Sequence, residues 1–205
     1  MPTIDEVKED IDRFDKDYEP EEWLVGQLFQ KYPRNTNLDP VLLKTKVLNT
    51  VYSAGVIAEY PVAAHIKSLS GLDSLIEKGS DDAVSLIANV QIGGRKFYFI
   101  VFATKYCNWH NPPAYPIFDK NVRECLRFHK RKDGFAKFTL DSLWTYPTFR
   151  NVVDKFRGHY GLDSFSYKEL DKFMYLFGRR LLAEAAAKSS NRQAIAGPPE
   201  EFHQP

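Results

Sequence analysis

An aspartate that stands just before a predicted helix is the first candidate for chemistry in this sequence. Asp119 follows Pro116, which favours extended backbone before it, and a helical spacing of apolar residues begins at Val122. An Asp in this place is typical of an N-cap, where unpaired N–H groups and the helix dipole favour a negative charge. We therefore expect Asp119 to be ionised, either as a plain helix cap or as a carboxylate that serves catalysis.

Two lysines and an aromatic turn precede Asp119. Lys105 lies 14 residues before it and Lys96 lies 23 residues before it. A lysine attacks as a nucleophile only as the free amine, and the alternative for Lys105 is an ion pair or a phosphate contact. Trp109 could stack on an unpaired base or cover a hydrophobic core. His110 could bind a phosphate or a water molecule, or be an ordinary loop histidine.

Basic residues are concentrated directly after Asp119. Residues 119–137 hold seven Lys and Arg and three acidic residues, which gives a net charge of +4. Such a patch can bind phosphates, because neutralising them releases counterions. The alternative is a solvated helix end, where cations favour the C-terminal dipole. The residues considered for contacts to DNA are Lys120, Arg123, Arg127, Lys130 and Arg131.

The apolar patterns predict a mostly α-helical protein with three parts. Residues 1–34 are expected to form an acidic helical segment that packs on the main domain, with Pro20 opening its second helix. Residues 35–187 form the helical domain, and residues 188–205 lose the apolar pattern and are predicted to be a disordered tail. Residues 1–22 carry ten acidic and three basic residues, a net −7, although the whole chain carries +1.

The segment 88–102 has two alternative structures. Its aromatic and β-branched residues flank Gly93-Gly94, which is typical of a β-hairpin with a two-residue turn. The other alternative is a helix. A hairpin here would also permit a third reading of the whole protein, an α+β protein with no role in binding nucleic acid.

Several stretches resemble the helix-hairpin-helix DNA glycosylases. They are GGRK at 93–96, PIFDKNVR at 116–123 and, closest to the 8-oxoguanine-glycosylase-fold subgroup of bacterial proteins, FATKYCNWHNPPAYPIFD at 102–119. The resemblance covers residues 38–183 and implies a helical glycosylase-like fold, with helix favoured for the segment 88–102. It implies that Asp119 is the catalytic aspartate.

The resemblance is incomplete at the lysine. Bifunctional members of the superfamily carry a nucleophilic Lys at the start of the helix before the Asp. Lys96 matches the hairpin context but lies further upstream than is common, an ungapped alignment places Val101 there, and Lys105 sits late in the helix. The stretch KVLNTVYSAGV also resembles a helix whose following loop inserts a side chain into the DNA stack. Asn49 is the candidate for that role, with an ordinary exposed helix residue as the alternative.

The implied activity is hydrolysis of the N-glycosidic bond of a modified or damaged base in DNA, with phage DNA and antiviral defence among the contexts. The base would be flipped into a pocket, and Asp119 would stabilise the positive charge that develops on the sugar. A lysine that reached the sugar would add AP-lyase activity. A catalytically inactive nucleic-acid-binding or regulatory module on the same fold is the alternative, favoured by the acidic N-terminal segment and the near-neutral net charge.

Other classes of function have no support in the sequence. No apolar run approaches the length of a membrane span, and the acidic start lacks a signal-peptide pattern, so a cytoplasmic protein is expected. Cys107 and Cys125 have no metal-ligand spacing and are expected to be reduced and buried. There is no phosphate-binding loop and no metal motif, so no cofactor and no metal are predicted.

Overall fold

The computed structural model describes residues 1–196, with side chains described as far as residue 189. This part of the chain is mostly α-helical, as the sequence predicted, with one small hairpin. No helix within it is long and apolar enough to cross a membrane. Its elements are α1 (Ile4–Lys31), α2 (Leu38–Tyr52), α3 (Glu59–Ser68), α4 (Leu72–Glu77), α5 (Asp81–Ala88), β1 (Asn89–Ile92), β2 (Arg95–Tyr98), α6 (Ile100–His110), α7 (Lys120–Asp133), the 3₁₀ turn η1 (Ser142–Trp144), α8 (Tyr146–Tyr160) and α9 (Tyr167–Ala196).

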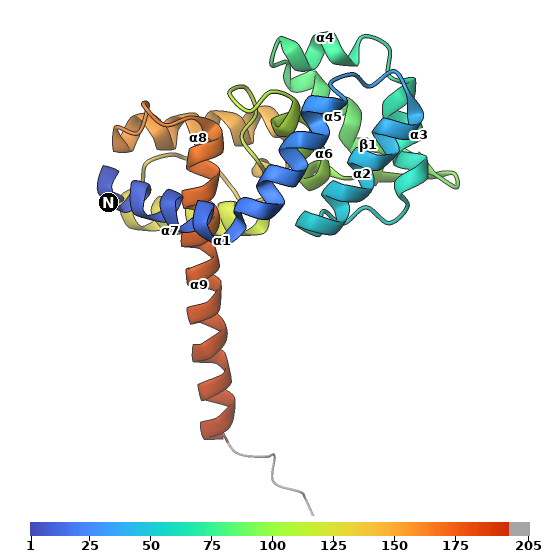
Figure 1. Ribbon diagram of the computed structural model, residues 1–205. Helices are drawn as coiled ribbons and strands as arrows, with labels where there is room; N and C mark the ends of the chain where they lie inside the picture. The colour runs from blue at the N-terminus through green and yellow to red at the C-terminus, as the bar shows by residue number, and fades with distance from the viewer. Residues whose placement is uncertain (197–205) are drawn as a thin grey trace, which may run out of the picture.

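Helix α1 extends across two groups of helices. Figure 1 shows α7, α8 and α9 on one side and α2 to α6 with the hairpin on the other, with α1 lying along both. The prediction that Pro20 opens a second helix is wrong, because α1 continues through it. A proline in a helix loses one backbone hydrogen bond. Here both halves of α1 bury apolar residues, Val7 and Phe14 before the proline and Val25 and Phe29 after it, and this burial offsets the loss.

The segment 89–98 forms a β-hairpin. β1 pairs antiparallel with β2, with Asn89 opposite Tyr98 and Ile92 opposite Arg95. Gly93 and Gly94 have φ values of 56° and 79°, as a two-residue turn with positive φ at both central positions requires. The prediction of a helix is therefore wrong for these residues, and the alternative prediction of a hairpin is confirmed. The helix that precedes Asp119 begins only at Ile100.

Charged residues hold α1 against α9. Three of the ten acidic side chains in residues 1–22 pair with basic side chains of α9, in antiparallel order. The buried carboxylate of Asp10 accepts two hydrogen bonds of 2.7 Å from the Arg180 guanidinium. The other pairs are Asp15 with Lys172 and Glu22 with Lys168.

The N-terminal segment shares the hydrophobic core of the main domain, and the last helix is longer than the sequence predicted. Val7, Val25 and Phe29 of the N-terminal segment belong to the same hydrophobic core as the later helices. Helix α9 continues to Ala196, so residues 188–196 are helical where a disordered tail was predicted. The run of alanines at 185–187 suits this extension, because Ala has the highest helix propensity. The remainder of the predicted tail, 197–205, lies outside the described residues.

Helices α7 and α9 approach each other closely at one glycine. A Cβ atom added at Gly178 of α9 would lie 1.9 Å from the carbonyl oxygen of Asn121, in the first turn of α7. No side chain can occupy that space without moving the backbone of one helix. Gly178 therefore sets the distance between α9 and the start of α7, where Asp119 is located.

We expect Gly178→Ala to lower the free energy of unfolding by about 1–3 kcal/mol, the usual cost of overpacking a core. Gly158→Ala is the matched control, because it lies within α8 and a Cβ atom there meets nothing within 4 Å. That control should leave stability unchanged or raise it slightly, since Ala is the better helix former. Urea unfolding followed by circular dichroism measures both, and equal stabilities of the two variants would contradict the tight contact.

Candidate active site

A cavity of about 510 Å³ contains both Lys105 and Asp119. Its lining comes from α1, α2, α6, the start of α7 and α9, so residues far apart in sequence meet in it. Aromatic residues of α1, α2 and α9 form part of its wall, namely Phe14, Tyr18, Tyr52 and Tyr175. This cavity, called the Asp119 pocket below, brings together two of the three predicted catalytic residues, Asp119 and Lys105.

Asp119 is the N-cap of α7, as the sequence predicted. Its Oδ1 accepts a hydrogen bond of 2.9 Å from the N–H of Val122. Its Oδ2 lies 4.0 Å from Nζ of Lys105, and the two side chains are only 11% and 9% exposed. The extended segment before the cap is held to α6, because the N–H of Phe118 donates to the Thr104 hydroxyl at 3.1 Å. Asp119 is thus fixed at the N-terminus of α7 and lies beside a basic side chain of α6.

Lys105 enters the pocket from the middle of α6. Its Nζ lies 5.1 Å from the centre of the Tyr52 ring, in addition to its approach to Asp119. Val101 lies one turn earlier on α6 and lines the same pocket. The face of α6 that carries residues 101 and 105 is therefore the face that points to Asp119.

Three further polar side chains of the pocket region were not predicted from the sequence. The Tyr52 hydroxyl donates to Oε1 of Glu22 at 2.7 Å, and Nζ of Lys168 lies 2.8 Å from Oε2 of the same carboxylate. Burial and the negative charge of Glu22 raise the pKa of Tyr52 well above its usual value. Both oxygens of Glu22 are thus occupied by partners within the protein.

Asp171 lies one turn after Lys168 on α9 and also lines the pocket. Its Oδ1 is buried and has no hydrogen-bond partner among the described residues. Burial and the negative charge of Asp119 raise the pKa of Asp171 to about 7. The spacing of Lys168, Asp171 and Tyr175 places them on one face of the helix, and this polar face beside the apolar stripe is the signal in the sequence that could have identified them.

Lys96 and Asn49 lie in other environments. Lys96 is exposed on β2 and does not line the Asp119 pocket. The Asn49 side chain donates to the carbonyl of Val56 at 2.9 Å and accepts from its N–H at 3.0 Å, and it also donates to Glu59. Asn49 therefore holds the loop after α2 in place, and its amide is engaged within the protein.

Trp109 and His110 face a different cavity, beside the end of α1. Nζ of Lys168 lies 4.2 Å from the centre of the Trp109 ring, so the ring packs against that ammonium group. Nε2 of His110 lies 3.1 Å from Nζ of Lys44. Burial and the ammonium of Lys44 lower the pKa of His110 to about 3, so its ring is neutral at pH 7 and accepts a hydrogen bond from Lys44.

Lys44 is a fully buried lysine that joins α1, α2 and α6. Besides Nε2 of His110, its Nζ has three oxygen acceptors within reach, the carbonyls of Tyr32 at 3.1 Å and Arg34 at 3.2 Å and the amide oxygen of Asn35 at 2.7 Å, so four acceptors share its three N–H donors. Burial lowers the pKa of Lys44 to about 7. Its partners satisfy the ammonium, which fixes the position of α6 and hence of Lys105.

Two of the predicted phosphate-binding residues make contacts within the protein. The Arg123 guanidinium lies 5.5 Å from the Phe118 ring centre and 5.0 Å from that of Trp144, and its Nε is buried. Arg127 forms an ion pair with Glu124. The charge of both residues remains near the surface, but their side chains are held in place.

The other three differ in exposure. Lys130 is partly buried and its ammonium donates to the carbonyl of Phe138. Lys120 and Arg131 are exposed, and Lys120 lines the Asp119 pocket. Of the five candidates for contacts to DNA, Lys120 is thus the one placed at the pocket itself.

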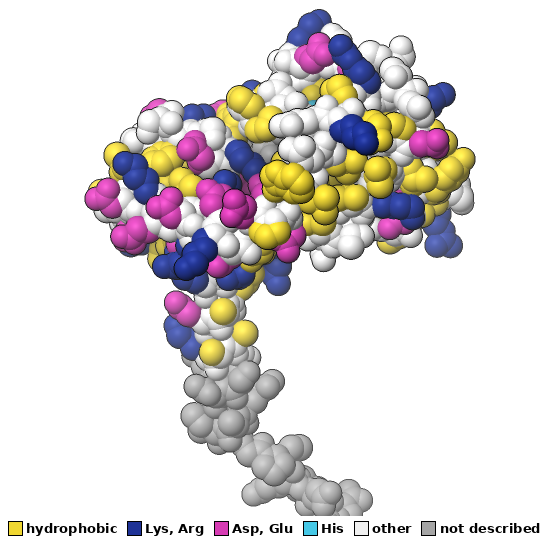
Figure 2. Space-filling model, viewed as in Figure 1, with side chains coloured by type: hydrophobic (Ala, Val, Ile, Leu, Met, Phe, Trp, Pro, Cys, Tyr) yellow, Lys and Arg dark blue, Asp and Glu magenta, His cyan; other side chains and the backbone are white. Residues whose placement is uncertain are grey.

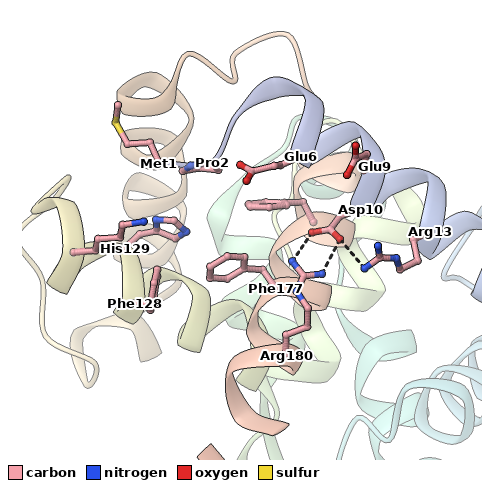
Figure 3. A pocket seen from close by; sticks show the side chains of 12 residues that line it. Met1, Pro2, Glu6, Glu9, Asp10, Arg13, Phe128, His129, Phe177 and Arg180 are labelled. Atoms are coloured by element: carbon pink, nitrogen blue, oxygen red, sulfur yellow. Dashed lines mark hydrogen bonds and ion pairs between the residues drawn. The ribbon is translucent and has the colours of Figure 1, made fainter. Parts of the chain in front are cut away.

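A second cavity of about 350 Å³ lies between the start of α1, α7 and α9. Figure 3 shows Asp10 in it, held by Arg180 and approached by Arg13 at 3.6 Å. His129 lines the same cavity, and burial lowers its pKa. The carboxylate of Asp10 has an arginine on each side, so its charge is compensated and the cluster holds α1 on α9.

No group of three or more His, Cys, Asp or Glu side chains within the described residues is arranged to hold a metal ion. Cys107 and Cys125 are both buried and unpaired with each other. Burial raises the pKa of both thiols well above the usual value, which keeps them protonated. The polar side chains that line the Asp119 pocket are those of acidic residues, lysines, three tyrosines, Ser53 and Asn121.

The buried Lys44 makes stability depend on pH. Its pKa is about 7 in the folded protein and about 10.4 when unfolded, so the unfolded chain binds more protons between these values. Stability is therefore expected to rise with pH in that window, by up to about 1.4 kcal/mol per pH unit. The difference in unfolding free energy between the wild type and Lys44→Met, measured by urea titration from pH 7 to about 10, should grow with pH. Lys46→Met, on the exposed face of α2, should give a flat difference, and a flat profile for Lys44 would contradict the shift.

The chain matches known sequences along most of its length. Residues 3–114 match the HI_0787_N family, which is described as an N-terminal domain. An uncharacterized protein of Haemophilus influenzae is 35% identical over 151 residues, which make up 74% of this chain and 72% of that protein. No solved structure matches. The family match contains Glu22, Tyr52 and Lys105 but ends before Asp119. With more than half of its length matched, the chain belongs to the HI_0787_N family.

Proposed function

We propose that this protein is a DNA N-glycosylase that removes a modified or damaged base. The observation that carries the proposal is the approach of Lys105 to Asp119, with Nζ and Oδ2 4.0 Å apart in one open pocket. Together with the likeness of the segment around Asp119 to the helix-hairpin-helix glycosylases, this arrangement favours chemistry at a sugar carbon.

The shape of the pocket suits a flipped base. A base in a duplex must leave the stack before an enzyme can act on it, and about 510 Å³ is ample for one base. The rings of Phe14, Tyr18 and Tyr175 cluster at one wall, with centroid distances from 4.6 to 6.1 Å. Aromatic side chains of this kind stack on bases without regard to sequence.

Asp119 and Lys105 have different roles at the sugar. When the N-glycosidic bond stretches, positive charge develops at C1′, and the fixed carboxylate of Asp119 stabilises it. The free amine of Lys105 has the lone pair needed to bond to C1′ as the bond between C1′ and the base breaks. The C1′–O4′ bond of the sugar ring then breaks, a proton passes from the nitrogen to O4′, and a Schiff base results. Without that attack a water molecule completes the reaction, and the enzyme releases the base but leaves the strand intact.

A nucleic-acid-binding module without catalysis is the second candidate. The acidic Glu21 and Glu22 at the pocket oppose DNA phosphates, and several basic side chains that were predicted to bind DNA have partners within the protein. Figure 2 shows acidic and basic side chains interspersed over the N-terminal half of α1 and its surroundings, without a broad basic face on this side. These features favour weak binding to DNA over tight binding.

The test is a base-excision assay on duplex DNA that carries oxidised or phage-type modified bases, with alkali added to reveal abasic sites. We expect Asp119→Asn to lower the excision rate by about 10²–10⁴-fold, because the charge on the sugar loses its counter-charge. Lys105→Gln should abolish trapping of the protein on DNA by borohydride. Lys96→Gln, at an exposed position outside the pocket, is the control and should behave as the wild type.

The outcomes separate the two candidates. Abasic sites that depend on Asp119 support the glycosylase. Equal binding of DNA by wild type and Asp119→Asn, with no excision of any base, supports the binding module. Trapping that survives Lys105→Gln but is lost in Lys96→Gln would show that the lysine has been assigned wrongly.

A further inference from the structure

Asp171 is a carboxyl group in the Asp119 pocket that the reaction described above does not use. It projects from α9, and its Oδ1 is fully buried with no hydrogen-bond partner among the described residues. Buried polar atoms in proteins are nearly always paired. Asp171 also lines the Asp119 pocket, so a change in its side-chain rotamer on substrate binding would let this carboxyl group find its partner in the substrate.

The surroundings of Asp171 contain charges of both signs. Five helices or helix ends contribute them, and the two lysines offset part of the negative charge of the carboxylates. The charged and titratable groups that face it are Glu22 of α1, Tyr52 of α2, Lys105 of α6, Asp119 at the start of α7 and Lys168 of α9.

Asp119 and Asp171 occupy contrasting environments in the same pocket. Asp119 accepts an N–H at a helix N-terminus and lies near Lys105. Asp171 lacks a donor for Oδ1, and burial together with the nearby Asp119 raises its pKa to about 7. Two carboxyl groups in contrasting environments within one site are the usual arrangement for dividing acid from base roles.

We propose that Asp171 is the general acid of the reaction, which protonates the departing base while Asp119 stabilises the sugar. This inference rests on the proposed glycosylase function. The carboxyl O–H of Asp171 gives its proton to a ring nitrogen of the base, and the electron pair of the C1′–N bond leaves with the base. Either Lys105 or a water molecule bonds to C1′.

The balance of protons holds for both nucleophiles. When the free amine of Lys105 attacks, the base leaves with the electron pair of the C1′–N bond and becomes neutral by taking the proton of Asp171. The other products are the carboxylate of Asp171 and a positively charged nitrogen of Lys105 bonded to C1′. With water the products are the neutral base and the C1′–OH of an abasic site, and the proton that water loses passes to Asp119. A general acid is needed most for a base that is uncharged in the substrate, because such a base departs from C1′ slowly unless it is protonated. We therefore infer that the substrate carries a neutral modified base.

The first measurement needs no substrate. Asp171 is followed by ¹³C NMR of aspartate-labelled protein, with its carboxyl signal identified by its absence in Asp171→Asn. We expect a titration midpoint near pH 7 that moves down in Asp119→Asn, because that change removes a neighbouring negative charge. A midpoint near that of an ordinary aspartate, about 4, overturns the proposal.

The second measurement is the pH dependence of excision in single turnover, on DNA carrying the neutral modified base that the wild type removes. We expect the wild-type rate to fall about tenfold per pH unit above pH 7 as Asp171 loses its proton. Asp171→Asn should be about 10²-fold slower at pH 6 and should lack this fall. Asp163→Asn, at an exposed position in the loop before α9, is the matched control and should keep the wild-type profile.

The outcomes distinguish the inference from the function on which it rests. Excision by Asp171→Asn that keeps the wild-type fall above pH 7, at whatever rate, overturns the role of Asp171 and leaves the glycosylase standing. Absence of excision by the wild type from every base tested overturns both. Thermal unfolding of Asp171→Asn, whose amide has the shape of the carboxyl group, verifies that the variant is folded.

Discussion

The close contact between α9 and the first turn of α7 is the constraint on which the candidate site depends. Because Gly178 has no Cβ, the backbone of α9 lies directly against the carbonyl of Asn121. This contact places the N-terminus of α7, with Asp119 as its cap, beside the face of α9 that carries Lys168 and Asp171. A wider spacing would separate the two aspartates and change the electrostatics of the pocket.

The pocket gathers charges whose burial must be compensated. Glu22 is paired with Lys168 and Tyr52, and Asp119 is paired with Lys105 and a backbone N–H. A buried charge that lacked such partners would cost several kcal/mol. These pairs also connect α1, α2, α6 and α9, so the same interactions that stabilise the fold arrange the site.

The sequence predicted features that depend on neighbouring residues better than features that depend on packing between distant segments. Asp119 as a helix cap and the Gly93-Gly94 hairpin follow from local backbone preferences, and both occur in the structure. Pro20 misled the prediction, because packing on both halves of α1 outweighs one lost hydrogen bond. The helical spacing of Lys168, Asp171 and Tyr175 could have indicated a shared polar face on α9. That this face lines the Asp119 pocket depends on how α9 packs against α7, which the spacing does not report.

Helical geometry explains how Lys105 reaches Asp119. Val101 and Lys105 are four residues apart on α6, so both lie on one face and both line the Asp119 pocket. If the proposed glycosylase function holds, an ungapped alignment back from Asp119 places Val101 at the position expected for a nucleophilic lysine. A lysine one turn later has a long flexible side chain, and here its ammonium reaches within 4.0 Å of Asp119. A lysine at position 105 thus reaches Asp119 from the same face of α6, whereas Lys96, on the hairpin, does not line the pocket.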